Sequence, residues 1–396
     1  MPNPARKHRT TAVEVVIAGG GVAALEAALA LRDLAGDRVK LALMAPAPDF
    51  VYRAVAVLEP FARRRARHLP LAKFAAELNA TFEQDVLASV DQQRRVLLTG
   101  RRREMAYDAL VIAVGATTSE VLPGSISMDP SRMDESLHGL IDEIDSGAVR
   151  SLAFVTPMAA WPLPVYEVAL LVQDRAREKN IDLDVTIITA EPRPLAVFGE
   201  NVSAAVAALL AYAGIEIVVG AQVESSSGEL IVLPSGRRLQ FDRVVAVPRL
   251  QGPAIAGVPA DADGFVPITP LCEVSGSERV YAAGDATDYP VKFGGIAAQQ
   301  ADTVAASIAA LGGALTEPRP FDGIIHGTLQ GGSERRRLYF TALMSRGIAR
   351  DSRISRTPTC SPEAKIAARY LGPYLAELWG EGPRWLAGQV SGSSDA

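Results

Sequence analysis

The chain has 396 residues, of which 48% are hydrophobic and 21% charged, a balance typical of folded globular proteins rather than disordered or fibrous ones. Its 40 basic and 45 acidic residues give a net charge of −5, so it lacks the overall positive charge of a nucleic-acid binder. Two cysteines, Cys272 and Cys360, and four scattered histidines exclude a disulfide scaffold and argue against a metal site. We therefore expect a reduced, cytoplasmic protein of two or three domains, with no metal and no nucleic-acid partner.

The N-terminal region predicts a dinucleotide-binding unit. A β-branched run at Val13–Ala18 precedes three glycines, an Ala- and Leu-rich helix at Val22–Ala35 and a second strand at Val39–Met44. The connecting loop, Gly19-Gly20-Gly21-Val22-Ala23-Ala24, fits the pattern G-x-G-x-x-A. In this pattern the first glycine permits a tight turn, the second lets the backbone approach a pyrophosphate, and the small third residue lets helix and strand pack closely. The free N–H groups of the helix N-terminus favour an anion there.

The acid that usually binds the adenosine ribose is missing. It normally ends the second strand, about 20 residues beyond the glycines. Here that place holds Met44-Ala45-Pro46, and the nearest carboxylate, Asp49, lies beyond a Pro-x-Pro segment. The sequence therefore leaves ribose recognition open, with backbone groups and water as one means.

The remainder of the chain predicts further α/β structure and a C-terminal layer. Before residue 120 we expect a basic helical stretch at Phe61–Asn79 and strands near 82–90, 96–99 and 109–114. A second α/β pattern then predicts strands at 152–156, 184–189, 216–219 and 243–247, helices at 166–178 and 201–213, and a hairpin near 225–236. A strand near residue 280 and a long helix at Gly295–Ala310 follow. The remaining residues alternate aromatic, Arg and Gly side chains, which suggests a separate layer.

Two later strands carry motifs that add to the glycine loop. Tyr107–Gly115 is a strand that ends in a glycine turn, and Val280–Ala283 is a strand followed by Gly284 and the acid Asp285. Together the three motifs resemble the two-dinucleotide-binding-domain flavoproteins, the pyridine nucleotide-disulfide oxidoreductase superfamily. The resemblance covers roughly residues 13–320.

This resemblance implies an enzyme that uses FAD. It assigns the FAD pyrophosphate to the glycine loop and the ribityl chain to Asp285, with the segment at Val86 passing the adenine. The turns at Gly115 and Gly284 would lie beside the cofactor.

Within the superfamily, the chain looks most like sulfide:quinone oxidoreductases and type II NADH dehydrogenases. Asp49-Phe-Val-Tyr-Arg53 resembles their segment that approaches the flavin ring. Lys292-Phe-Gly294-Gly295 and the helix after it resemble their quinone-side helix, whose N-terminus would stabilise negative charge on the reduced ring. Gln299 and Gln300 on that helix are either part of this site or an ordinary polar helix face.

The sequence departs from these relatives in its thiols. No C-x-x-C or C-x-x-x-x-C pair occurs, and Pro157-Met-Ala-Ala-Trp161 stands in the region where sulfide-oxidising relatives carry a cysteine. Cys360 is isolated, and Cys272 reads as a small buried residue. We therefore expect that the enzyme does not use thiol chemistry.

Nicotinamide use by the usual route is also disfavoured. The strand at 152–156 is followed by prolines and Trp161 instead of glycines, so N–H groups that could cradle a phosphate are lost. Glu167 lies near the start of the next helix, where its charge would repel a phosphate.

The fold we expect is α/β, with an FAD-binding Rossmann-type domain split between residues 1–120 and 251–320, an inserted second Rossmann-like domain at 121–250, and a C-terminal layer at 321–396. Three hypotheses follow. The first is an FAD-dependent oxidoreductase that passes electrons from an unidentified donor to a quinone or similar acceptor. The second is an NAD(P)H-dependent flavin reductase. The third is a flavoprotein without turnover that serves as a binding partner. Donor, acceptor, proton-transferring residue and oligomeric state stay open, a homodimer included.

Three arginine clusters bear on membrane contact. They are Arg63–Arg65, Arg101–Arg103 and Arg335–Arg337. Solvated surface is the first interpretation, and contact with anionic headgroups is the functional one. Segments Ala364–Leu371 and Tyr374–Trp379 read as helices that dock on the flavin domain or lie at a membrane interface. We expect at most peripheral membrane contact.

Overall fold

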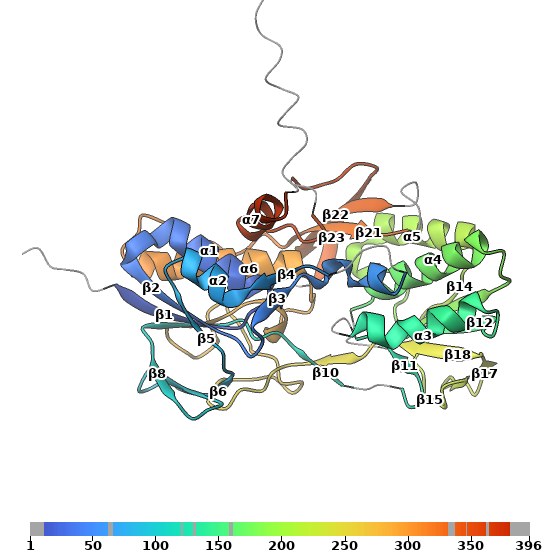
Figure 1. Cartoon of the computed structure of the whole chain (residues 1–396), viewed down its shortest axis with the longest axis horizontal. Helices are drawn as coiled ribbons and strands as arrows, with labels where there is room; N and C mark the ends of the chain where they lie inside the picture. Colours follow the sequence, from blue (N-terminus) through green and yellow to red (C-terminus); the bar gives the residue numbers. More distant parts are fainter. Residues whose placement is uncertain are drawn as a thin grey trace, which may run out of the picture.

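The computed structural model describes residues 12–61, 66–119, 122–129, 132–157, 161–331, 337–345, 347–361 and 364–380. Two α/β units lie side by side, and the C-terminal elements run along one edge of both (Figure 1). The order of the elements confirms the predicted fold class, because the sheet that starts at the N-terminus is completed by a strand near residue 280.

The first unit is a five-stranded parallel sheet in the order β20-β9-β1-β2-β5. Its strands are β1 (Val13–Ala18), β2 (Val39–Met44), β5 (Thr81–Glu83), β9 (Ala109–Ile112) and β20 (Val280–Ala282). Helices α1 (Val22–Ala35) and α6 (Gly294–Leu311) cover one face, and they contact each other closely. Alanines dominate the buried positions of both helices, and their small side chains let the two backbones approach.

The other face of this sheet is covered by antiparallel strands. These are β6 (Leu87–Asp91), β7 (Val96–Thr99) and β8 (Glu104–Ala106). The buried side chains between the two layers come mostly from Val, Ile, Leu and Ala. The first unit is therefore a three-layer arrangement of helices, parallel sheet and antiparallel sheet.

The second unit repeats the parallel-sheet pattern in the order β11-β18-β12-β13-β14. Its strands are β11 (Ile126–Ser127), β12 (Ser151–Thr156), β13 (Asp184–Thr189), β14 (Glu216–Val218) and β18 (Arg243–Ala246). Its helices are α3 (Met133–Asp145), α4 (Leu163–Glu178) and α5 (Glu200–Ala213), with a short 3-10 turn at Ala196–Phe198 before α5. The first unit has such turns at Gly36–Arg38 and Gly284–Ala286. A hairpin sheet, β15 (Ser225–Ser226), β16 (Leu230–Val232) and β17 (Arg238–Gln240), flanks it.

Two chain crossings connect the units. The antiparallel strands β10 (Thr117–Ser119) and β19 (Arg249–Gln251) pair with each other where the chain leaves the first unit and returns to it. The second unit is thus an insertion whose entry and exit lie next to each other.

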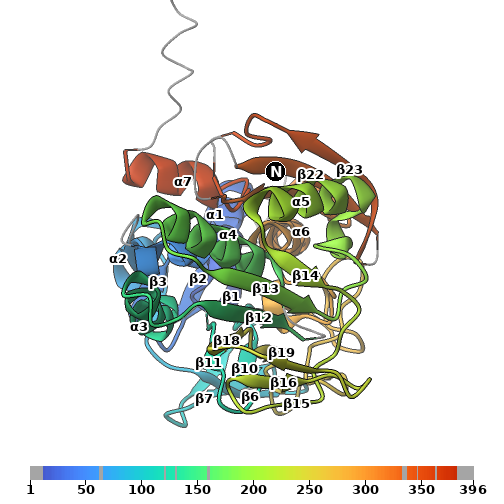
Figure 2. The same cartoon turned by 90° about the vertical axis from the view of Figure 1, so that its right-hand side faces the viewer.

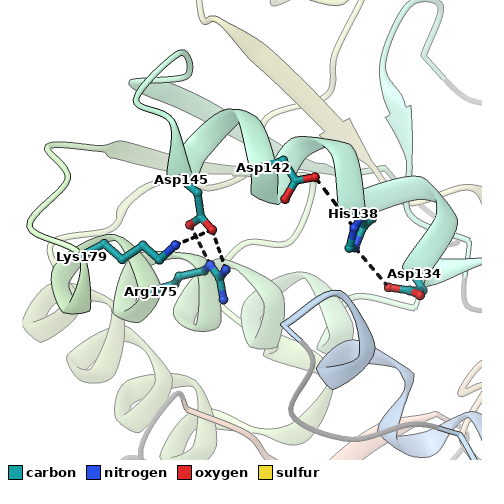
Figure 3. Close-up of polar contacts among 6 residues, drawn as sticks. All are labelled: Asp134, His138, Asp142, Asp145, Arg175 and Lys179. Carbon is teal, nitrogen blue, oxygen red and sulfur yellow. Dashed lines mark hydrogen bonds and ion pairs between the residues drawn. The ribbon is translucent and has the colours of Figure 1, made fainter.

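Helices α3 and α4 are joined by an ion-pair network (Figure 3). The Asp145 carboxylate accepts two hydrogen bonds from Arg175, at 2.8 and 2.5 Å, and one from Lys179 at 2.6 Å. These cations hold the pKa of Asp145 low, at about 2. On the exposed face of α3, His138 lies 3.9 Å from Asp134 and 3.8 Å from Asp142.

The C-terminal layer packs on both units. It contains the antiparallel strands β21 (Ile324–Leu329), β22 (Leu338–Ser345) and β23 (Ile348–Ser355), and helix α7 (Leu371–Leu378). Strand β21 contacts α6 and α4. Strand β23 contacts α5, and α7 contacts α1 (Figure 2). Within the described ranges, no helix is long and apolar enough to cross a membrane.

Two element predictions were wrong. Instead of one helical stretch at Phe61–Asn79, the structure has a 3-10 helix at Arg53–Phe61, the strand pair β3 (Asp49–Val51) and β4 (His68–Pro70), and a short helix α2 (Leu71–Glu77). Pro70 has extended backbone and precedes the helix, so α2 begins only after it. The second error is Ala364–Leu371, whose residues 364–370 are not helical. Arg63–Arg65, Arg335 and Arg336 lie outside the described residues.

Candidate functional site

The glycine loop is held between the ends of β2 and β9. The Gly19 N–H donates to Met44 O at 2.7 Å, and Gly19 has a φ of +139°, a conformation that side chains rarely adopt. A Cβ on Gly19 would lie 2.0 Å from Ala113 O, so only glycine fits. This close approach fixes the path of the loop into α1.

The start of α1 is open in the way an anion requires. Gly21 is the N-cap, with φ −95° and ψ −169°, and no side chain caps the helix. A Cβ on Gly21 would meet no described atom within 4 Å, and the first turn contains no acid. The first N–H groups of a helix have no partners within it, so this glycine-lined space fits a pyrophosphate.

The turn after β20 lies against the same loop. A Cβ on Gly284, which has a φ of +78°, would be 3.3 Å from the Cβ atoms of Ala23 and Ala297. The Gly284 N–H donates to Gln300 Oε1 at 2.7 Å. Gln300 is fully buried, so it holds this turn and does not form a polar helix face. Its neighbour Gln299 joins α6 to β21 through hydrogen bonds with backbone groups of Ile324.

Asp285 and Lys292 lie in a desolvated environment beside this turn. Burial raises the pKa of Asp285, and the charge of Lys292 partly offsets that rise. Burial lowers the pKa of Lys292 to about 8. The Lys292 Nζ atom donates to Thr287 O and lies 3.8 Å from the centre of the Phe265 ring. The lysine is thus held near Asp285 by its own loop.

The N-terminus of α6 is covered by the C-terminal segment and by aromatic rings. A Cβ on Gly294 would be 3.0 Å from Ile366. The N-cap residue Phe293 packs on Trp161, with ring centres 5.5 Å apart, and Trp161 packs on Phe198 at 5.7 Å. The region where the sequence lacks the expected thiol is therefore occupied by an aromatic cluster.

The sequence analysis missed a buried ion pair next to this cluster. Lys365 Nζ donates to both carboxylate oxygens of Glu167 at 2.6 Å, and the Gln330 N–H donates to the same carboxylate at 2.8 Å. The Glu167 side chain is 1% exposed and that of Lys365 12%. Burial raises the pKa of Glu167, and Lys365 partly offsets this. The pair links α4 to the segment that crosses the start of α6. A charged residue among the apolar residues of α4 was the signal available in the sequence.

The second unit differs from a usual dinucleotide-binding unit in its acid and in its phosphate turn. Glu191 follows β13, where an acid would bind the adenosine ribose. Its carboxylate instead accepts a hydrogen bond from Tyr166 Oη at 2.8 Å and one from the Ala196 N–H at 3.1 Å. Pro157 and Trp161 border the turn after β12, and residues 158–160 lie outside the described ranges. The Glu191 carboxylate is thus hydrogen-bonded within its own unit, and the turn that would hold a phosphate lacks glycines.

A cavity of about 320 Å³ lies between α6, β21 and residues 360–372. This is in the size range of small-molecule sites, ~300–1,000 Å³. Its walls include Ala298, Asp302, Ile324, His326, Cys360 and Ile366. The other thiol, Cys272, is fully buried, and burial raises its pKa to about 12.

The other sequence-predicted residues lie on surrounding loops. Val86 is 44% exposed in the connection between β5 and β6. Gly115 follows β9 with a φ of +76°, and Arg53 is exposed at the start of the 3-10 helix. The structure thus brings together the glycine loop and Gly284, and it places Val86, Gly115 and Arg53 on separate loops.

The comparisons with known proteins decide the family. The family model described as pyridine nucleotide-disulphide oxidoreductase matches residues 13–150 and 166–308, which is more than half of the chain. The chain belongs to this family. It is therefore an enzyme, a flavin-dependent oxidoreductase, and the family resemblance predicted from the sequence is confirmed.

The named relatives have low sequence identity to this chain. A sulfide-quinone reductase of Aquifex aeolicus is 24% identical over 196 residues, and the match spans 46% of this chain and only 44% of that protein. The crystal structure of the Aquifex aeolicus sulfide:quinone oxidoreductase has a TM-score of 0.77 at 22% identity and covers 87% of each chain. A ferredoxin reductase from Rhodopseudomonas palustris has a TM-score of 0.64 at 20% identity, covering 83% of this chain and 82% of that one. These structures share the fold.

Proposed function

We propose that the chain is an FAD-dependent oxidoreductase that passes electrons from a donor other than NAD(P)H to a quinone or similar acceptor. The observation that carries this proposal is the difference between the two positions where a nucleotide could bind. The first has an uncapped, glycine-lined helix N-terminus. The second has Glu191 bound to its own unit and Trp161 packed between Phe198 and Phe293.

For FAD we propose the residues that the motifs indicate. The loop Gly19–Ala24 would hold the pyrophosphate, Asp285 the ribityl hydroxyls, and the segment at Val86 the adenine. Gly115 and Gly284 would line the groove, and the ring would meet Arg53, Lys292, Gly294 and Gly295. FAD supplies two-electron redox chemistry when bound. In this proposal residues 1–120 and 251–320 form the flavin-binding domain, 121–250 the inserted domain and 321–396 the covering layer.

The acceptor side of the proposal rests on the C-terminal layer. The cavity beside α6 has small apolar walls with a few polar groups, as sites for small aromatic molecules do. The named relatives include a sulfide-quinone reductase, which supports a quinone as acceptor. A quinone is drawn from a membrane, so we propose a protein that works in the cytoplasm with peripheral membrane contact.

The decisive test is anaerobic reduction of the purified, FAD-loaded protein by a panel of donors. Flavin absorbance would be followed with NADH, NADPH, sulfide and small organic thiols. Bleaching by a donor other than NAD(P)H, followed by reoxidation with decylubiquinone, is the expected result. Rapid bleaching by NADH would overturn the proposal and favour the flavin reductase. Release of FMN, or of no flavin, on denaturation would remove the FAD assignment.

A further inference from the structure

A pair of buried carboxyl groups lies between the flavin-side helices and the C-terminal layer. Glu26 of α1 is fully buried, and its carboxyl group neighbours that of Asp302 on α6, which lies in the wall of the cavity. Two ionised carboxylates repel each other in a desolvated site, which favours the protonated form of one of them. We therefore expect one proton on this pair of side chains.

The surrounding donors place that proton on Asp302. Glu26 accepts hydrogen bonds from the backbone N–H groups of Tyr370, at 2.9 Å, and Leu371, at 2.5 Å, and such bonds stabilise its charged form. Asp302 Oδ1 is buried and has no N–H or O–H donor among the described residues. Burial and the neighbouring charge of Glu26 raise the pKa of Asp302 to about 8, against an opposing effect of Arg369.

The charged and titratable groups around the pair come from three elements. Arg369 approaches from the segment before α7, and the Asp33 carboxylate of α1 accepts a hydrogen bond from Tyr370 Oη at 3.3 Å. Across the cavity, His326 of β21 and the exposed Asp322 form the facing wall. Asp302 itself lines this cavity, so its carboxyl group borders both Glu26 and the space for a ligand.

We propose that Asp302, poised by Glu26, is the proton donor to the acceptor bound in the cavity between α6, β21 and residues 360–372. This inference rests on the proposed function, because it assumes that the acceptor occupies that cavity. It assigns the proton-transferring residue that no motif of the sequence supplied.

The chemistry balances for a quinone. Conversion to the hydroquinone takes two electrons, which the oxidoreductase activity supplies, and two protons. The O–H bond of Asp302 breaks and one new O–H bond forms on a quinone oxygen, which leaves the Asp302 carboxylate. Solvent supplies the second proton and afterwards reprotonates Asp302.

The test uses the FAD-loaded full chain, photoreduced without oxygen and mixed with decylubiquinone between pH 6 and 10. In the parent protein we expect the reoxidation rate to fall about tenfold between pH 7 and pH 9, because the pKa of Asp302 is about 8. Asp302→Asn should be slower by on the order of 10²-fold at pH 7 and should show no such fall. Asp302→Glu should restore both the rate at pH 7 and its fall at higher pH.

Asp33→Asn is the matched control, since it removes an exposed carboxylate that bonds the same C-terminal segment outside the cavity. It should keep the parent profile. An Asp302→Asn profile that falls like the parent's would overturn the inference and leave the quinone assignment intact. Failure of decylubiquinone to reoxidise the parent protein would instead remove the proposed acceptor, and this inference with it.

An infrared pH titration of the resting holoenzyme gives a readout apart from turnover. A protonated-carboxyl band should disappear around pH 8 in the parent protein and should be missing from Asp302→Asn. A parent spectrum without that band at pH 7 would contradict a proton on this pair.

Discussion

Individual residues explain why the first nucleotide position stays open. Gly19 is required by a backbone contact, since a Cβ there would clash with Ala113 O. Gly21 is different, because its Cβ position faces empty space at the start of α1. One glycine thus serves the fold, and the other leaves open the space that we propose for the pyrophosphate. The motif alone does not make this distinction.

This distinction gives a prediction for Gly21→Val. The apoprotein should keep its far-UV circular dichroism and thermal midpoint, because a Cβ at this position meets no described atom within 4 Å. FAD affinity should fall at least about tenfold, or ~1.4 kcal/mol, since the isopropyl group takes the space of the pyrophosphate. Fluorescence titration with FAD measures this.

Gly139→Val serves as the control, because Gly139 also has open space at its Cβ position but lies on α3, away from the loop. Unchanged FAD affinity in Gly21→Val would show that the open space does not hold the pyrophosphate.

The two thiols give a second prediction at this scale. Cys272 is buried with a pKa raised to about 12, and it is therefore unreactive near neutral pH. Cys360 lines the cavity and forms no disulfide. The Cys272→Ala/Cys360→Ala double variant should retain flavin reduction by the true donor in stopped-flow measurements. A loss of more than ~100-fold, or ~2.7 kcal/mol of barrier, with folding preserved would restore a sulfur relay.

Some of these residues could be predicted from the sequence and others could not. The glycine loop and the Gly284-Asp285 turn were predicted because each motif is local. The ion pair of Glu167 with Lys365 was not, since its partners are far apart in sequence and meet only when the C-terminal segment crosses α6. Glu167 was instead interpreted as a charge that repels phosphate.

At the scale of elements, the strands and long helices followed from the sequence because their apolar periodicity matches their burial. The buried parts of the parallel strands β1, β9 and β12 are mostly continuous apolar runs, as in strands covered on both faces. The structure of residues 364–370 did not follow from the sequence, because tertiary contacts outweigh their local helix preference. Ile366 packs over Gly294, and Glu26 captures the backbone N–H groups of Tyr370 and Leu371.

The packing of α3 on α4 gives a prediction about pH. Asp145 has a pKa lowered from 3.8 to about 2, so its ion pairs stabilise the fold above pH ~4, and this contribution is lost as the pH falls through about 2. Asp145→Asn should lower the free energy of unfolding by about 2.5 kcal/mol at pH 7, at ~1.4 kcal/mol per pKa unit. Urea unfolding should show the difference from the parent shrinking toward pH 2.

Asp134→Asn on the same helix is the control (Figure 3). Its carboxylate is exposed and 3.9 Å from His138, so its replacement should change the unfolding free energy by less than about 0.5 kcal/mol. Equal losses in the two variants would mean that the Asp145 network contributes nothing specific.

At the scale of the molecule, the C-terminal layer is attached to both units by buried polar contacts. Glu26 holds the start of α7 on the first unit, and Glu167 holds Lys365 on the second. The layer therefore fixes how the units sit relative to each other around the start of α6.

Lys365→Met tests that attachment. It leaves the Glu167 carboxylate buried without its cation, which should cost about 3–5 kcal/mol of unfolding free energy. Without the cation, the pKa of Glu167 rises further, so the folded state takes up a proton and the deficit should be smaller at pH 5 than at pH 8. Denaturant unfolding at both pH values measures this.

The double variant Glu167→Gln/Lys365→Met should recover much of the loss, since no buried charge is left. A single variant as stable as the parent at pH 8 would show that the layer is held by its apolar contacts alone.

The insertion of the second unit has a consequence for the order of events during synthesis. Strand β9 ends at Ile112, but its partner β20 begins only at Val280, and α6, which packs on α1, comes later still. At ~5–20 residues per second, the ribosome needs on the order of 8–35 s to make the roughly 170 residues between them. Throughout that interval the outer edge of β9 and the alanine face of α1 have no partner, whereas the inserted unit has all five of its strands as soon as β18 ends at Ala246. The part of the chain made first is thus finished last, and a nascent chain stalled before residue 280 should bind chaperones through its N-terminal unit.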